Sequence, residues 1–497
     1  MIHSHDHPPQ GTVRDWLDAR AQDSQTAIVF LETEETLSWS DLRNRARSLA
    51  GGLVAQGISK GESIAIIHPN GRAGVEALYA CLYGGYRATM INLAAGPDAI
   101  SYALEHSRAR VAFVHNDQRE VFAKAAPAGM TALDPEALSG QGALPDLTPD
   151  DHALLMYTSG TTGKPKGVVH SHASLLAGGW TTSLAHQLGP QDRGFCVLPI
   201  YHINGLCVSM MGALVSAGSL AMVSRFSSTR FWQQADQAQV TWFSVVPTII
   251  SHLLHGEVNP SEALCKRLRF GRSASSALAV ETQTAFEKRF GVPIVETMGL
   301  TETAAQILSN PLPPGVRKVG SPGVAYGNEA RILTADLQEA AVGDEGEIAI
   351  RGPNVMQEYL FNPDATAATF ADDWLRTGDL GRMDADGYVF VTGRLKELII
   401  KGGENIAPRE IDEVLYGHPD VIEAAAFARP CKRYGETVEA AVALRSSAHL
   451  GQDELISLCQ ERLGAFKAPD VVHVLAELPK GPSGKIQRLK LAELVPG

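Results

Sequence analysis

The chain has 497 residues, of which 44% are apolar, so it can bury the cores of two to four compact units. Its formal net charge of −12 argues against a nucleic-acid partner and against binding to an anionic membrane. Residues 1–7 lack the features of a signal peptide, and the six cysteines show no metal-ligand spacing. We therefore expect a cytoplasmic protein with reduced, buried thiols. The most apolar run, residues 207–223, contains glycines and serines and is expected to form a buried core, not a membrane span.

Helical and strand patterns alternate along the first part of the chain. Residues 39–53 carry an apolar face at helical spacing, with Ser40 or Asp41 as the expected cap and Gly57 at the end. The segment 125–149 is expected to be a loop-rich connection. Short apolar runs typical of buried strands occur at residues 63–67, 88–92, 111–115 and 218–223. The alternation predicts an α/β fold with largely parallel sheets.

Two later segments indicate further units. Short β-like runs between glycine and proline turns predict a β-rich subdomain over about residues 313–392. From Arg394 onward an α+β pattern begins, with a helix over 407–415 whose first turn contains proline. We therefore expect a large N-terminal domain over residues 1–393 and a small C-terminal domain over residues 397–497, joined by the short connection 394–396.

A glycine-rich loop between Tyr157 and Gly167 is the most informative stretch of the chain. It follows a strand-like run, 153–156, and precedes a helix-like run, 173–177. Its glycines allow backbone N–H groups to turn towards one anion, while hydroxyls add donors and lysines add charge, as a polyphosphate requires. A flexible surface turn is the alternative. The candidate phosphate ligands are Thr158, Ser159, Gly160, Thr161, Thr162, Gly163, Lys164 and Lys166.

This loop differs from the P-loop of ATPases and phosphotransferases. Only two residues separate Gly160 from Gly163, and Pro165 occupies the position of the magnesium-binding hydroxyl. The stretch instead resembles the phosphate-binding loop of the adenylate-forming superfamily, which includes acyl-CoA synthetases, luciferases and peptide-synthetase adenylation domains. The resemblance extends over about residues 12–491 and implies the fold of that superfamily.

A second motif, Met298-Gly-Leu-Thr-Glu302, follows the strand-like run 293–295. A carboxylate beside a phosphate loop is suited to Mg²⁺, although a charge at a helix N-terminus is the alternative for Glu302. The family resemblance implies that Thr301 and Glu302 act on phosphate and magnesium. Met298 occupies a position where the family usually stacks an aromatic residue on adenine. The resemblance also implies nucleotide contacts for Glu296, Thr297, Met298 and Gly299.

Further motifs of the family lie near this short connection, 394–396. In Thr377-Gly-Asp379 a carboxylate follows what we expect to be a tight turn, and Thr392-Gly-Arg394 comes soon after. The resemblance implies that Asp379 and Arg394 hold the ribose and that Lys396 is the hinge of a small, mobile C-terminal domain. It further implies that coenzyme A passes Lys401, Gly402 and Gly403.

Two lone residues gain meaning from their motifs. Lys485 ends the rigid loop from Pro479, where a surface turn is the alternative, and the family has its catalytic lysine in this motif. His202 and Asn204 resemble the acyl-pocket motif, in which the histidine gates or contacts the substrate. A structural role in an apolar run is the alternative for His202.

The resemblance implies an AMP-forming acid–CoA ligase. A carboxylate attacks the α-phosphorus of MgATP, and the acyl-adenylate then meets a thiol, most simply that of CoA. A standalone enzyme that loads a carrier protein, an ATP sensor without activity and luciferase-like oxygenase chemistry are the alternatives. The expected partners are the acid, ATP, Mg²⁺ and CoA, without nucleic acid or membrane span, in a monomer or homodimer.

The acid is predicted from Arg272-Ser-Ala-Ser-Ser-Ala-Leu278, where most family members have a Ser-Gly-Gly-Ala-Pro-like loop. This variant resembles the oxalyl-CoA synthetase branch, which handles small, doubly charged acids. That branch has a histidine where this chain has Ala305, which favours a related short carboxylate or sulfonate over oxalate. The alternative substrate is a medium-chain or aromatic acid. The alternative role of Arg272 is to cap a strand and pair with an acidic neighbour. Candidate residues of the acyl pocket are Arg272, Ser273, Ser275, Ser276, Gly299 and Ala305, opposite His202 and Asn204. The resemblance also implies nucleotide contacts for Ser275, Ser276 and Ala277.

Overall fold

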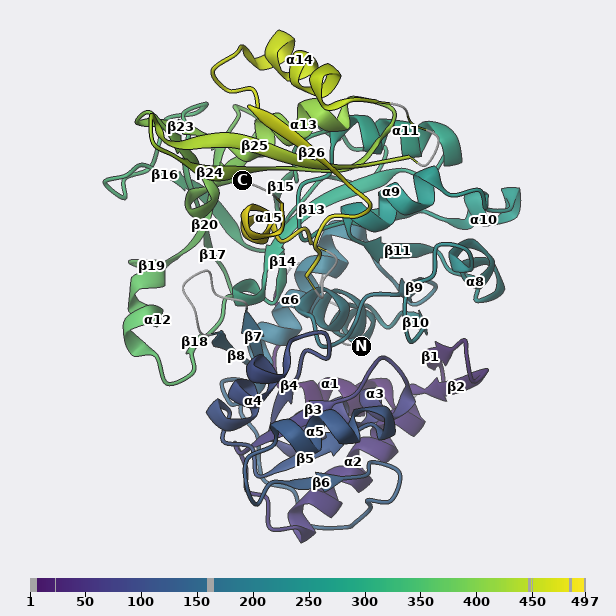
Figure 1. Ribbon diagram of the computed structural model, residues 1–497. Helices are drawn as coiled ribbons and strands as arrows, with labels where there is room; N and C mark the ends of the chain where they lie inside the picture. The colour runs from purple at the N-terminus through teal and green to yellow at the C-terminus, as the bar shows by residue number, and fades with distance from the viewer. Residues whose placement is uncertain are drawn as a thin grey trace.

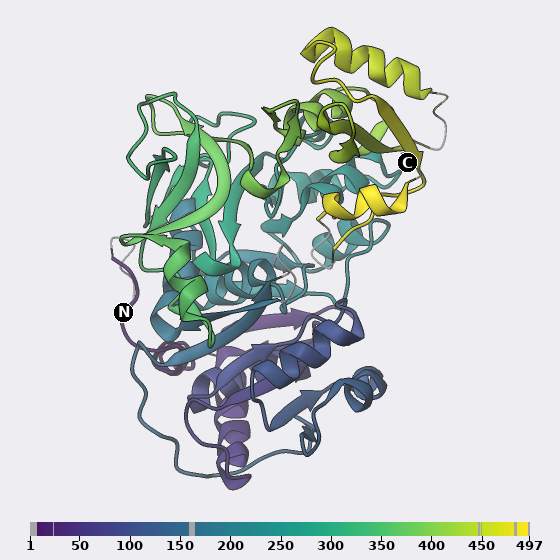
Figure 2. The same ribbon diagram turned by 60° about the vertical axis from the view of Figure 1, so that its left-hand side comes forward.

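The computed structural model describes residues 7–22, 24–158, 165–445, 448, 450–481 and 485–495. An N-terminal lobe lies at the bottom of Figure 1, a central region lies above it, and the C-terminal residues form the top. In Figure 2 the β-rich part (green) and the C-terminal part (yellow-green) lie over separate sides of the central region.

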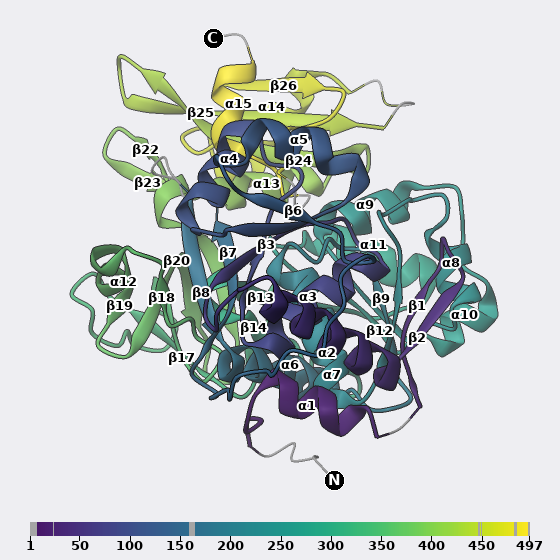
Figure 3. The ribbon, with the colours of Figure 1, turned by 90° about the horizontal axis from the view of Figure 1, so that it is seen from below.

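The N-terminal lobe is built around a seven-stranded sheet. Its order is β18 (Glu358–Tyr359), β8 (Lys166–Ser171), β7 (His152–Thr158), β4 (Arg87–Met90), β3 (Ser63–Ile67), β5 (Val111–Val114) and β6 (Thr131–Leu133). The strands from β7 to β6 are parallel because helical crossovers connect most of them, whereas β8 returns antiparallel to β7. Figure 3 shows helices on both faces of this lobe: α1 (Val13–Arg20), α2 (Trp39–Ala55) and α3 (Arg72–Gly84) on one, and α4 (Pro97–His106) and α5 (Arg119–Ala125) on the other.

A nine-stranded sheet forms the central region. Its order is β15 (Val324–Ala325), β14 (Ala305–Ser309), β13 (Ile294–Leu300), β12 (Phe270–Ser273), β11 (Trp242–Val245), β9 (Arg193–Cys196), β10 (Ser219–Met222), β1 (Thr26–Phe30) and β2 (Glu35–Ser38). One face packs on α8 (Phe231–Gln237), α9 (Pro247–His255), α10 (Glu262–Arg267) and α11 (Val280–Phe290).

The other face of the nine-stranded sheet packs on helices that it shares with the N-terminal lobe. They are α6 (His172–His186), the π-helix η2 (Asn204–Met211) and α7 (Gly212–Ser216), and one hydrophobic core joins them to both sheets. The apolar run 207–223 is buried there, as predicted. Within the described residues, no helix is long and apolar enough to cross a membrane.

The remaining chain forms two smaller sheets. The β-rich part contains β16 (Glu329–Leu333), β17 (Gly346–Arg351), α12 (Pro363–Thr369), β19 (Phe370–Ala371), β20 (Trp374–Met383) and β21 (Val389–Arg394). After the short helix η4 (Leu395–Glu397), the last sheet begins. It contains β22 (Ile399–Lys401), β23 (Glu404–Ile406), β24 (Val421–Cys431), β25 (Gly435–Leu444) and β26 (Val471–Leu475), with α13 (Pro408–Tyr416), α14 (Gln452–Leu463) and α15 (Arg488–Leu494).

The predicted α/β class with largely parallel sheets is confirmed, and several local predictions need correction. Ser38, not Ser40 or Asp41, caps α2, because its hydroxyl accepts the Asp41 N–H at 3.0 Å. The segment predicted as a loop, 125–149, contains β6. The strand predicted before the phosphate-loop candidate lies in β7 and the helix-like run 173–177 lies in α6, as predicted, and β8, antiparallel to β7, precedes that helix. All six cysteines are free thiols, but Cys265 and Cys431 are only half-buried.

Candidate active site

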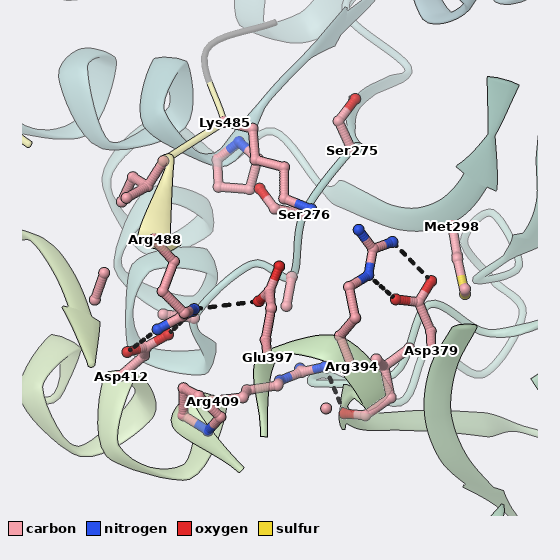
Figure 4. A pocket seen from close by; sticks show the side chains of 18 of the residues that line it. Ser275, Ser276, Met298, Asp379, Arg394, Glu397, Arg409, Asp412, Lys485 and Arg488 are labelled. Carbon is pink, nitrogen blue, oxygen red and sulfur yellow. Dashed lines mark hydrogen bonds and ion pairs between the residues drawn. The ribbon is translucent and has the colours of Figure 1, made fainter. Parts of the chain in front are cut away.

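A cavity of about 220 Å³ lies where the central region, the β-rich part and the last sheet meet. Figure 4 shows side chains from all three converging on it, with Lys485 and Arg394 pointing into the same space. Sequence motifs more than 200 residues apart therefore meet here, since Ser275 and Lys485 both line the cavity. Its lining includes Ser275, Ser276, Ala277, Glu296, Thr297, Met298, Gly299, Asp379, Arg394, Glu397, Arg409 and Lys485.

Asp379 and Arg394 form an ion pair at the edge of this cavity. They are direct cross-strand partners on β20 and β21, and Arg394 donates from Nε at 2.6 Å and from Nη2 at 3.3 Å to the two carboxylate oxygens. Burial alone lowers the pKa of Arg394, but the Asp379 carboxylate raises it above its ordinary value. Asp379 lies within a strand after Gly378, whose φ is +74°, so the predicted tight turn is a strand irregularity. The pair presents a rigid, polar edge to the cavity.

Lys485 reaches the cavity from the loop that precedes α15. Burial and the nearby Arg394 lower the pKa of Lys485, while Glu397 and Asp379 act in the opposite direction. Glu397 follows the predicted hinge residue Lys396, which is exposed. A lysine held between cations and carboxylates at the cavity has donors to offer an anion. Residues 482–484 of this loop lie outside the described residues.

The sequence reasoning missed the charged support of this lysine. Arg488 donates to Asp412 at 2.6 Å and to Glu397 at 3.2 Å, so it links α15 to α13 and to the segment after β21. Burial alone lowers the pKa of Arg488, and Asp412 and Glu397 raise it above its ordinary value. Figure 4 shows this network beside Lys485.

Glu302 and the ends of the phosphate-loop candidate lie close together. Tyr359 donates its hydroxyl to Glu302 Oε1 at 2.8 Å, and the Lys166 amine lies 4.3 Å from the centre of the Tyr359 ring. Thr158 ends β7 and Lys166 begins β8. The other candidates, Ser159, Gly160, Thr161, Thr162, Gly163 and Lys164, lie outside the described residues.

The environment of Glu302 fits a bound Mg²⁺. Its carboxylate is half-buried and, among the described residues, forms no ion pair with Lys, Arg or His. A carboxylate oxygen is an ordinary ligand for this cation, and bound phosphate supplies further oxygens. Thr301 precedes it in a short 3₁₀ turn, and the buried His170 lies with Nε2 2.6 Å from the Thr301 carbonyl oxygen.

Glu296 places a buried carboxyl group in the cavity wall. Its Oε1 accepts the Leu278 N–H at 3.0 Å, whereas Oε2 has no hydrogen-bond partner among the described residues. Burial raises the pKa of Glu296 to about 7, partly opposed by Arg409.

Gly299 is required by close packing of β13 against β14. A Cβ atom at this position would lie 1.7 Å from the carbonyl oxygen of Ala305. Ala305 is buried with a φ of +79°, and its small side chain continues the tight approach. Met298 lines the cavity next to Gly299, where it can pack on a ring face.

Arg272 is buried at the end of β12 and has only neutral hydrogen-bond partners among the described residues. It donates from Nη1 to Asn204 Oδ1 at 2.9 Å and to Ser244 Oγ at 3.0 Å, and from Nε to Gln306 Oε1 at 3.1 Å. Burial lowers the pKa of Arg272 to about 9. The alternative that Arg272 pairs with an acidic neighbour is therefore wrong. Ser244 and Gln306 were not anticipated, because they come from other strands.

Of the other acyl-pocket candidates, Asn204 contacts this arginine directly. Asn204 Nδ2 donates to Ser275 Oγ at 3.4 Å and so connects Arg272 to a residue of the cavity wall. Ser273 is fully buried, and its hydroxyl has no partner among the described residues. His202 lies before η2 with its ring 5.0 Å from that of Tyr201.

The predicted coenzyme A face is separate from the cavity. Gly402 and Gly403 have φ values of +62° and +90° in the turn between β22 and β23, and both are exposed. Lys401 is buried, with Nζ 3.7 Å from Asp470. None of the three lines the cavity that holds Lys485.

Comparison with known proteins agrees with this geometry. The family description "AMP-binding enzyme" matches residues 16–360, and "AMP-binding enzyme C-terminal domain" matches residues 410–485. The chain belongs to the AMP-binding enzyme family. Membership of this family explains both the order of the motifs along the chain and their convergence on one cavity.

Several known proteins are similar to this chain over most of their length. A sulfoacetate–CoA ligase of Cupriavidus necator is 45% identical over 475 residues, covering 93% of each chain. An oxalate–CoA ligase of Arabidopsis thaliana is 39% identical over 348 residues, covering 69% of this chain and 68% of that protein. The crystal structure of ATP-bound MatB from Rhodopseudomonas palustris superposes with a TM-score of 0.89 at 29% identity, covering 97% and 99% of the chains. The protein is accordingly an AMP-forming acid–CoA ligase with the adenylate-forming fold, and it uses a carboxylic acid, ATP, Mg²⁺ and CoA.

Proposed function

We propose that this ligase activates a short acid with a second anionic group, of the sulfoacetate type. The observation that carries the proposal is Arg272, a buried guanidinium whose described partners are all neutral. A buried cation without a counter-charge is costly, and an anion on the substrate supplies that charge. A sulfonate or carboxylate also matches the planar donor array of arginine.

The position of Arg272 limits the length of the acid. Asn204 alone separates its guanidinium from Ser275, which lines the cavity with Lys485. A substrate carboxylate in the cavity and an anionic tail near Arg272 are thus bridged by a short chain. The similarity to sulfoacetate–CoA and oxalate–CoA ligases supports an acid of this size and charge.

The adenylation step places two anions in contact, so charge compensation dominates it. An oxygen of the acid attacks the α-phosphorus of ATP, and the bond from that phosphorus to the pyrophosphate oxygen breaks. We assign to Lys485 the stabilisation of the attacking carboxylate and the phosphate, and to Asp379 and Arg394 the ribose. Thr301 and Glu302 would hold the phosphates and Mg²⁺. When bound, this cation would offset the negative charge of the departing pyrophosphate.

The second step uses the other face of the small domain. The CoA thiolate attacks the acyl carbonyl, and AMP leaves with its phosphate oxygen. Because Gly402 and Gly403 lie outside the cavity, we propose that residues 397–497 rotate about Lys396, withdrawing Lys485 and presenting the two glycines. The cytoplasmic location, the monomer or homodimer and the lack of a nucleic-acid partner stay predictions from composition and charge.

A pyrophosphate-release screen tests the choice of acid. Purified enzyme with ATP, Mg²⁺ and CoA is offered sulfoacetate, oxalate, malonate, acetate, hexanoate and benzoate. We expect the highest kcat/KM for a short dianion. Arg272→Gln should lower that value by about 100-fold, since charge-assisted hydrogen bonds are lost, with a smaller effect on acetate. A clear optimum at hexanoate or benzoate would contradict the proposed acid while leaving the ligase reaction intact.

A further inference from the structure

Gln306 lies directly behind the cavity wall. It occupies β14, opposite Gly299 of β13, and its side chain is buried. Gly299 lines the cavity, so Gln306 lies one strand away from the cavity. Figure 1 shows β13 and β14 beside α6, which carries two further partners of this amide.

The hydrogen bonds of Gln306 define the orientation of its amide. Its Oε1 accepts from Arg272 Nε at 3.1 Å and lies 3.0 Å from His186 Nε2, and its Nε2 donates to the Thr181 carbonyl at 3.2 Å. Arg272 can only donate hydrogen bonds, and the Thr181 carbonyl oxygen can only accept them. The side chain at position 306 must therefore supply an acceptor for Arg272 and a donor for Thr181. A glutamate would turn an oxygen towards the Thr181 carbonyl and leave it unpaired. Glutamine satisfies both contacts without adding charge.

The charge of Arg272 is preserved by these contacts. The other two partners, Asn204 and Ser244, are also neutral. His186 is kept neutral because burial, and then Arg272, lower its pKa to about 3. Cys207 also faces the guanidinium, and burial raises the pKa of its thiol, so it stays protonated. Among the described groups around Arg272, none carries a negative charge.

We propose that Gln306 is a specificity-determining residue: its amide orients Arg272 while leaving the guanidinium charge free for the anionic tail of the acid. This inference rests on the proposed function. A carboxylate at the same position would neutralise Arg272 internally and turn the pocket towards short acids with uncharged tails. Specificity would thus be determined by one neutral contact behind the wall as well as by the residue that meets the substrate.

The test compares Gln306→Glu with Gln306→Met. Both changes remove the neutral acceptor–donor pair, but only the first adds a negative charge. We measure kcat/KM for sulfoacetate and propionate, by pyrophosphate release, in both variants and in the wild type. For Gln306→Glu the sulfoacetate-to-propionate ratio is expected to fall by about 100-fold, as for loss of a close charge pair. For Gln306→Met the ratio is expected to stay within about tenfold of the wild type, because Arg272 keeps its charge.

A second variant, with the carboxylate at another contact of Arg272, distinguishes the effect of charge from a folding defect of Gln306→Glu. Asn204→Asp puts a carboxylate next to Arg272 Nη1, on the opposite side from Gln306, and should lower the same ratio. An unchanged ratio in a folded Gln306→Glu enzyme, or equal losses in the Glu and Met variants, would overturn the role of Gln306. The wild-type preference reports separately on the proposed function, because a wild type that prefers uncharged acids contradicts that function whatever the variants do.

Discussion

Replacing Glu296 by glutamine removes a carboxyl group that the fold keeps out of water. Burial raises its pKa from 4.5 to about 7, so its contribution to stability is fully present below pH 4.5 and is lost as pH rises through 7. The rise corresponds to about 3 kcal/mol of free energy of unfolding at pH values above 8. Glutamine keeps the acceptor for the Leu278 N–H and does not ionise. We therefore expect Glu296→Gln to be more stable than the wild type at pH 8.5, with little difference at pH 5.

Differential scanning calorimetry across this pH range measures the effect. For a cooperative unit of about 400 residues, about 3 kcal/mol corresponds to an increase in Tm of about 4 °C. Glu287→Gln is a matched control on α11. Burial tends to raise the pKa of Glu287, but Arg317 at 2.5 Å and the Ile294 N–H outweigh it, so its pKa is lowered. Its carboxylate stabilises the fold above pH 4.5, and that stability is lost as pH falls through the folded pKa.

The two variants should thus differ in the sign of their effect at neutral and alkaline pH. Glu287→Gln is expected to lower Tm at pH 7 and to cost less as the pH falls below 4.5. A Tm difference for Glu296→Gln that stays constant between pH 5 and pH 8.5 would refute the reasoning. It would mean that the carboxyl group keeps one protonation state throughout that range.

Four further variants test catalysis. Lys485→Ala should lower acid-dependent ATP–pyrophosphate exchange by about 100-fold or more but leave thioester formation from supplied acyl-adenylate largely intact. Lys396→Pro should do the reverse because proline stiffens the hinge, and equal losses in both half-reactions for both variants would contradict domain rotation. Because the pKa of Lys485 is lowered, adenylation should decline on the alkaline side at a lower pH than for an ordinary lysine. Glu397→Gln should move this decline lower still, whereas an unchanged pH profile would exclude Glu397 as a partner. Gly299→Ala should abolish adenylation, since its Cβ would lie 1.7 Å from the Ala305 carbonyl oxygen, and a fully active variant would contradict this packing.

Local sequence determined the elements and the order of the motifs. Hydrophobic spacing located β3, β5 and α2 to within a few residues, because burial of one face or of a whole strand is encoded in neighbouring residues. Motifs that resemble those of the adenylate-forming superfamily indicated Arg272, Asp379, Arg394 and Lys485 as residues of interest. Local sequence misplaced the cap of α2, because two serines lie close together in sequence and only backbone geometry selects Ser38.

Tertiary structure alone decided which of these residues meet. Asp379 faces Arg394 because of the register of β20 and β21, and Tyr359 reaches Glu302 across 57 residues. Gln306 and Arg272 are 34 residues apart on β14 and β12, and no local pattern shows that their side chains meet. Strand register and helix packing bring such partners together through contacts distant in sequence. The sequence shows which residues are present, but only the fold determines that the groups around Arg272 are neutral and that the acyl pocket keeps a positive charge.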